Sequence, residues 1–144
     1  MKLGIFTKPE HVEKIVNYLN QYTDIKYIIS TNRREIDLFK YDVGVSYCWP
    51  WKISQEQLST KPWYNYHPGL LPHCKGVDCY TNAINLKKYG VTLHRMDQEF
   101  DTGEIITTLE FNADPVNTQD LANITHYKLF ELFKATINQL VSDT

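Results

Sequence analysis

Two polar side chains, Asn65 and His67, stand two residues apart in the aromatic stretch PWYNYH, directly before Pro68. Side chains alternate along a β-strand, so this pair shares one face while Tyr64 and Tyr66 take the other. Ligands of open α/β sheets bind at the carboxyl ends of strands. An amide and an imidazole at such an end are suited to stabilise the oxyanion of an acyl transfer. The pattern is also typical of a buried, hydrogen-bonded histidine beside a turn asparagine.

Two further candidates follow this pair, His94 in the run VTLHRM and Asp101 in the turn DTG. A carboxylate near the oxyanion donors could accept a proton from an attacking amine, which contributes roughly 10²–10⁴-fold to a rate. Asp and Gly are also ordinary turn residues, so neither candidate indicates catalysis alone. Taken together, an Asn, two His and an Asp suggest chemistry on an acyl group.

A zinc site is a competing interpretation of the same region. Its candidate ligands are His67, His73, Cys74, Cys79 and His94. Their spacing matches no common closed zinc site, and no pair of CxxC motifs is present. We therefore expect no metal ion at these residues. The sequence also has no Walker loop and no GxGxxG motif, which argues against phosphate binding by loops of those two kinds.

The length and composition indicate a single soluble globular domain over residues 1–144. The chain is 42% hydrophobic and 22% charged, with a net charge of -2 and a pI of about 6.2. It has no basic field for nucleic acid or anionic lipid, and no apolar stretch long enough to span a membrane. The N-terminus becomes charged too early for a signal peptide, and three cysteines without convincing disulfide spacing fit a reducing cytoplasm.

The elements that must position these residues follow from hydrophobic patterns. Apolar runs predict strands over 2–7, 25–30, 42–47, 62–67, 91–96 and 104–111. Helical spacing predicts a helix opened by Pro9, a short one within 32–40, one over 79–88 closed by Gly90, and a long C-terminal helix capped by Thr118. The alternation predicts an α/β fold with a mostly parallel sheet, in which the last two strands could be antiparallel.

The strings NYHPGLLPHCKG and AINLKKYGVTLHRMDQEFDTGEII resemble the catalytic core of the 10-formyltetrahydrofolate-dependent formyltransferases. That family includes glycinamide ribonucleotide, methionyl-tRNA and sugar-nucleotide enzymes. Its pattern is N-x-H at a strand end, an H-P-x-x-L-P-x-x-x-G loop, a G-V-T-x-H strand and a D-T-G loop. All four parts occur here in order, densely over 64–107.

The resemblance implies a Rossmann-like formyltransferase fold, with a mostly parallel twisted sheet flanked by helices, and 10-formyltetrahydrofolate as cosubstrate. It implies that Asn65 and His67 hold the formyl oxygen, that Asp101 accepts the amine proton, and that His94 is a partner at the Asp101 site. The expected folate contacts are Tyr47, Trp49, Ile53, Leu71, Asp97 and Phe100.

The acceptor is inferred from departures from the family pattern. Only about a dozen residues, 31–41, separate the second predicted strand from the third, where the family usually has more chain. In addition, FTKPEH lacks the Gly-Ser-rich phosphate loop of a glycinamide ribonucleotide enzyme. No basic surface is available for tRNA. A small-molecule amine, most plausibly on an amino-sugar nucleotide, is therefore the expected acceptor. The alternatives are a non-catalytic folate- or nucleotide-binding module and a formyl-folate hydrolase.

The C-terminal helix also leads us to expect a homodimer. Its apolar side chains form a stripe that either packs wholly on its own sheet or exceeds what one sheet face can cover: Leu129, Leu132, Phe133, Ile137, Leu140 and Val141.

Overall fold

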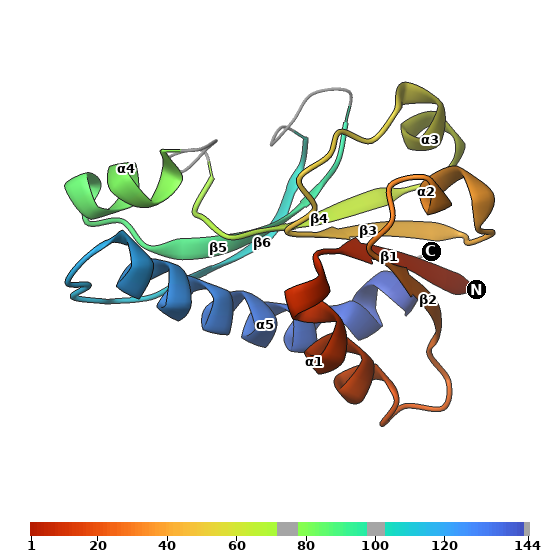
Figure 1. Ribbon diagram of the computed structural model, residues 1–144, viewed down its shortest axis with the longest axis horizontal. Helices are drawn as coiled ribbons and strands as arrows, with labels where there is room; N and C mark the ends of the chain where they lie inside the picture. Colours follow the sequence, from red (N-terminus) through yellow and green to blue (C-terminus); the bar gives the residue numbers. More distant parts are fainter. Residues whose placement is uncertain (72–77, 98–102, 143–144) are drawn as a thin grey trace.

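The computed structural model describes residues 1–71, 78–97 and 103–142 as a six-stranded sheet with helices on both faces (Figure 1). The strands are β1 (Lys2–Thr7), β2 (Lys26–Ser30), β3 (Val43–Tyr47), β4 (Trp63–His67), β5 (Gly90–Arg95) and β6 (Ile105–Glu110). The helices are α1 (Pro9–Leu19), α2 (Glu35–Leu38), α3 (Gln55–Thr60), α4 (Cys79–Leu86) and α5 (Thr118–Ser142).

The sheet has the strand order β2-β1-β3-β4-β5-β6. β1 pairs in parallel with β2 and β3, and β3 pairs in parallel with β4. β5 is antiparallel to both β4 and β6. The predicted α/β class and the antiparallel pairing of the last two strands, β5 and β6, are therefore confirmed. Antiparallel pairing begins one strand earlier, between β4 and β5.

Helices α1 and α5 cover one face of the sheet (Figure 1). Ile15 and Leu19 of α1 join Leu129, Phe133 and other α5 residues in one buried cluster with side chains of β1, β3, β4 and β5. Five apolar side chains of α5 are at most 5% exposed, namely Leu129, Leu132, Phe133, Ile137 and Leu140. The stripe that suggested a homodimer is thus covered by its own chain, and it no longer supports that expectation.

Helices α2 and α3 lie on the opposite face, over a second and more aromatic cluster (Figure 1). There the Trp63 ring lies directly over Gly44 of the neighbouring strand, where a Cβ would overlap the ring. Phe6 packs beside Trp63, with ring centroids 5.7 Å apart. The bare backbone of Gly44 is therefore what allows an indole to lie flat between β3 and α3.

The structure corrects several local predictions. Helix α4 ends at Leu86 and is capped by Lys87, which takes the left-handed conformation with φ 53°, whereas Gly90 already belongs to β5. The cap of α5 is Asn117, whose Oδ1 accepts from the Asp120 amide at 2.8 Å, and not Thr118. The spacing argument against disulfides fails for Cys79, which is disulfide-bonded.

Helix α3 is not predicted from the sequence, because its residues show no apolar periodicity.

Among the described residues, none of the helices combines the length and the hydropathy that a membrane-spanning helix needs.

Candidate active site

Asn65, His67 and His94 lie on the same face of the sheet, on neighbouring strands. Asn65 is paired with His94, and His67 with Thr92, across the antiparallel β4–β5 ladder. Tyr64, Tyr66 and Leu93, which alternate with them along these strands, belong instead to the buried cluster that contains residues of α1 and α5. The exposed fractions of Asn65, His67 and His94 are only 6%, 8% and 1%, so their polar atoms are held in a largely dry environment.

Asn65 and His94 are joined by a hydrogen bond. The Asn65 Nδ2 lies 3.1 Å from the His94 Nε2, and the His94 Nδ1 lies 3.1 Å from the carbonyl of Arg95. A carbonyl only accepts, so the Nδ1 carries the proton and the Nε2 accepts from the Asn65 amide. His94 thereby fixes the amide, while the second N–H of Asn65 stays available for a substrate oxygen.

The loop after β4 is held against β5 by a single hydroxyl. The Thr92 Oγ1 donates to the Gly69 carbonyl at 2.8 Å and accepts from the Leu71 amide at 3.1 Å. The Gly69 amide in turn donates to the His67 carbonyl at 2.9 Å. Sequence reasoning overlooked Thr92, although its place in the G-V-T-x-H run, two residues before His94, was the available signal.

The residues expected to contact folate do not all lie together in the structure. Trp49 and Ile53 are buried on the Asn65 side, within the aromatic cluster that also contains Trp63. Leu71 is buried beside Thr92, and Asp97 is exposed just beyond β5.

Tyr47 differs from these residues, because it is fully buried on the α1/α5 face, where its ring packs against Phe133. The structure does not bring Tyr47 to the face of Asn65, and its backbone is the part nearest the site. Phe100 and Asp101 lie outside the described residues, so their roles stay predictions.

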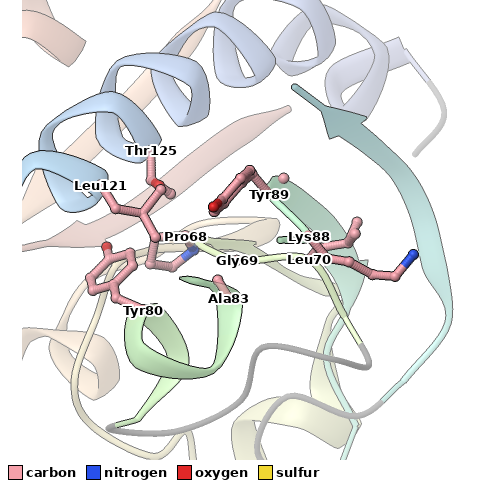
Figure 2. Close-up of a pocket in the computed structure, with 10 residues that line it drawn as sticks. Pro68, Gly69, Leu70, Tyr80, Ala83, Lys88, Tyr89, Leu121 and Thr125 are labelled. Carbon is pink, nitrogen blue, oxygen red and sulfur yellow. The ribbon is translucent and has the colours of Figure 1, made fainter. Parts of the chain in front are cut away.

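A small pocket lies behind the candidate site, between α4, α5 and the loop after β4 (Figure 2). Its volume is about 10 Å³, which is enough for about one water molecule. Pro68, Leu70, Tyr80 and Leu121 are among the residues that line it. It is far too small for a pteridine ring, so it is a packing feature and not the expected folate pocket.

Comparison with known proteins identifies the class. The model of the formyl transferase family matches residues 11–130, and the chain belongs to this family. The methionyl-tRNA formyltransferase of Pseudothermotoga lettingae is 26% identical over 132 residues, which cover 83% of this chain and 44% of that protein. That of Thermotoga neapolitana is 44% identical over 59 residues, 40% of this chain and 19% of that protein. The chain therefore spans less than half the length of these relatives.

Solved structures show the same fold. A 4-N formyltransferase from Francisella tularensis superposes with a TM-score of 0.87 at 22% identity, covering 99% of this chain and 70% of that one. A phosphoribosylglycinamide formyltransferase from Campylobacter jejuni gives 0.78 at 19% identity, covering 98% and 97%. The family and the Rossmann-like formyltransferase fold that the motifs predicted are thus confirmed.

Proposed function

We propose that this chain is an N-formyltransferase that moves the formyl group of 10-formyltetrahydrofolate to the primary amine of an amino-sugar nucleotide. The observation that carries the proposal is the hydrogen-bonded pair of Asn65 and His94 beside His67, on a buried face at the carboxyl end of β4. The membership of the formyl transferase family supports the same reaction.

The proposed reaction is a direct transfer. The neutral amine attacks the formyl carbon, and the carbonyl oxygen becomes an oxyanion held by Asn65 and His67. Asp101 takes the proton of the amine, and collapse of the oxyanion expels N10 of the folate, which takes up this proton from Asp101 directly or through water. A preorganised donor in a dry site acts on the developing charge without reorganisation, and one such donor is worth about 3–4 kcal/mol.

The proposed acceptor rests on the relatives and on charge. The Francisella structure is described as a 4-N formyltransferase, and one from Helicobacter canadensis as an N-formyltransferase with folinic acid and dTDP-3-aminofucose. The latter superposes with a TM-score of 0.81 at 21% identity. A net charge of -2 offers little attraction to tRNA, and Thr7–Lys8–Pro9 gives no glycine loop for a phosphate.

The test is turnover of 10-formyltetrahydrofolate with a panel of dTDP- and UDP-linked amino sugars, followed by tetrahydrofolate release and by the mass of the formylated sugar. We expect Asn65→Ala to lower kcat about 10²–10³-fold. Asn82→Ala, an exposed asparagine of α4, is the matched control and should leave kcat unchanged.

The role of Asp101 is tested in the same assay. Asp101→Asn should abolish most turnover, while the exposed Asp114→Asn should be neutral. Full activity of Asn65→Ala would refute the proposal. Calorimetric binding of 5-formyltetrahydrofolate without turnover of any amine would favour a binding module, and formate release that no amine accelerates would favour a hydrolase.

A further inference from the structure

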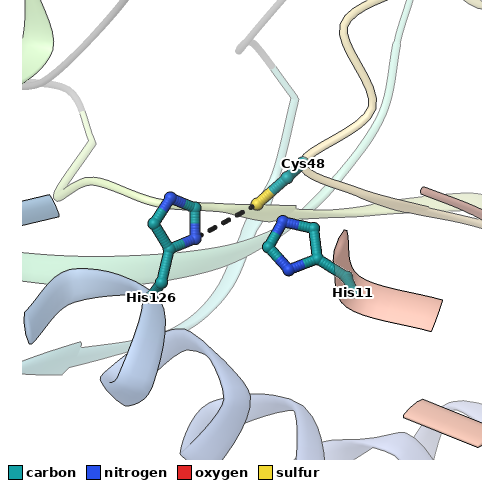
Figure 3. A group of neighbouring side chains, drawn as sticks. All are labelled: His11, Cys48 and His126. Carbon is teal, nitrogen blue, oxygen red and sulfur yellow. Dashed lines mark hydrogen bonds between the residues drawn. The ribbon is translucent and has the colours of Figure 1, made fainter. Parts of the chain in front are cut away.

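Three side chains that the proposed reaction does not use meet on the other face of the sheet. His11 comes from α1, Cys48 follows the last residue of β3, and His126 comes from α5. One ligand atom from each lies within 4.8 Å of the others. Figure 3 shows the two imidazole rings on either side of the Cys48 sulfur. His11 also packs edge-on against Tyr47, which places the group on the α1/α5 side and away from Asn65.

We propose that His11, Cys48 and His126 form a binding site for a borderline-soft transition-metal ion, best matched by Zn²⁺. Two imidazoles and a thiolate are a preferred ligand set for this ion, and they leave a fourth position for water or a small ligand. The distance from the Cys48 Sγ to the His126 Nδ1 is 3.9 Å. A sulfur and a nitrogen ligand on one tetrahedral Zn²⁺ lie about 3.6 Å apart, so this pair has to close by about 0.3 Å. The other separations, each within 4.8 Å, have to close by no more than about 1.5 Å.

His11 provides the strongest single observation. Its side chain is only 7% exposed, yet its Nδ1 has no hydrogen-bond partner in the described part of the chain. A buried polar atom without a partner is costly and is uncommon in folded proteins. Burial, aided by the nearby Lys14, lowers the pKa of His11 to about 4. The imidazole is therefore neutral at pH 7, which is the form that coordinates metal ions.

His126 is already oriented as a ligand. Its Nε2 lies 3.3 Å from the Tyr80 hydroxyl, and its Nδ1 faces the Cys48 sulfur. A hydrogen bond to the distal nitrogen is the usual way in which proteins fix a metal-binding imidazole. The rings of His11 and His126 are stacked, with centroids 5.3 Å apart, so small rotations bring both nitrogens toward one point.

Cys48 is a free thiol held in an unusual backbone conformation. Its φ of 54° lies in the left-handed region, which is unfavourable for a residue other than glycine. Burial raises the pKa of the thiol to about 12, although Lys8 and Lys14 oppose the rise. The sulfur is therefore poorly suited to act as a free nucleophile at pH 7, whereas a bound cation would displace its proton.

The charges around the cluster determine how strongly an ion is held. Lys8 and Lys14 act on the cluster as positive charges and Glu10 as a negative one. Lys14 is also placed over the rings of Tyr47 and Phe130, 5.6 and 5.3 Å from their centroids. The two lysines favour the thiolate and oppose a dication, so we expect the lysines to weaken the site without abolishing it.

The test uses the full chain, without a histidine tag, stripped of metal and titrated with Co²⁺ as a spectroscopic probe. We expect one equivalent to give a sulfur-to-cobalt charge-transfer band together with tetrahedral d–d bands, both removed by Zn²⁺. Cys48→Ser should lose the charge-transfer band, and His126→Gln should weaken binding at least tenfold. Tyr80→Phe, which removes only the outer hydrogen bond, should weaken it about tenfold.

Two further variants make the test decisive. Cys48→Gly removes the thiol and suits the positive φ, so it should fold with an unchanged circular dichroism spectrum and still lose the band. A Cys74→Ser/Cys79→Ser variant removes the other two cysteines and should keep the band. Absence of cobalt binding by the wild-type chain would overturn the site. A band that survives Cys48→Gly, or disappears with Cys74 and Cys79, would overturn it equally.

Discussion

We propose that His94 is a positioning residue, which acts on the reaction through its hydrogen bond to Asn65. His94→Ala should release the Asn65 amide and lower kcat about tenfold or more, with little change in the KM for the folate. His94→Gln should recover part of the loss, because its side-chain oxygen can again accept from the amide. The Asn65→Ala/His94→Ala double variant should be no slower than Asn65→Ala, since both changes remove one unit. Fully additive losses would show instead that His94 acts independently.

The buried imidazole of His11 should make the metal-free protein sensitive to acid. Burial lowers its folded pKa to about 4, below the ordinary value of 6.5. The unfolded chain then binds more protons between these values, so the stability is fully present above pH 6.5 and is lost as the pH falls toward 4. The full loss from this group is at most about 3 kcal/mol.

Urea unfolding in EDTA at a series of pH values between 8 and 4 measures this effect. His11→Gln removes the titrating group, so its free energy of unfolding should fall less steeply over this range than that of the wild type. The pKa of His126 is lowered by burial as well, so part of the slope should remain in the variant. An unchanged slope in His11→Gln would contradict the assignment.

At the scale of elements, the packing of Trp63 from β4 against β3 requires a glycine at position 44. A Cβ at Gly44 would overlap the Trp63 ring in a fully buried layer. Gly44→Ala should therefore lower the free energy of unfolding by about 3 kcal/mol or more. Combining it with Trp63→Leu should cost clearly less than the sum of the two changes, by more than about 1 kcal/mol, because the smaller side chain relieves the overlap. Additive effects in denaturant titrations would refute this explanation.

The structure and the sequence prediction differ on which residue caps the N-terminus of α5. Asn117 accepts from the Asp120 amide, so Asn117→Ala should cost about 1 kcal/mol in thermal or urea unfolding. Thr118→Ala, at the position first expected to be the cap, should change the stability by less than about 0.5 kcal/mol. The reverse order of effects would restore Thr118 as the cap.

These elements also show what the sequence could predict. The strands were predictable because each is an apolar or β-branched run between turn residues, and α5 because its apolar spacing extends over many turns. Helix α3 has no such stripe, and its only signal was Ser54, whose side chain accepts from the Gln57 amide. Asn65, His67 and His94 could be proposed as site residues because local strand geometry and a family motif both mark them.

The cluster of His11, Cys48 and His126 could not be predicted in the same way. Its residues come from α1, the end of β3 and α5, and no local spacing links them. Only the packing of both helices on one sheet face brings the three side chains together. The candidate zinc ligands proposed from the sequence were, in contrast, those that happened to be near one another along the chain.

At the scale of the whole molecule, α5 supports the candidate site from behind. Tyr66 lies between Asn65 and His67 and points the opposite way, where its hydroxyl donates to the Thr136 hydroxyl at 2.8 Å. Thr136 in turn donates to the Leu132 carbonyl, and the ring of Tyr66 packs on Phe133 with centroids 5.3 Å apart. A shift of β4 by one residue would turn Asn65 and His67 toward α5, so this packing fixes which face carries them.

Phe133 is the side chain on which this support depends most. It is fully buried and contacts the rings of Tyr47, Tyr66 and Phe130. Phe133→Ala should therefore lower the free energy of unfolding by about 3–5 kcal/mol. Since small domains are stable by only about 5–15 kcal/mol in all, such a loss should also reduce the folded population near the melting temperature. Tyr127→Ala, an aromatic truncation on the same helix at a side chain that is 67% exposed, should change stability by less than about 0.5 kcal/mol. If both variants unfolded at the wild-type urea concentration, α5 would not be the element that fixes the face of β4.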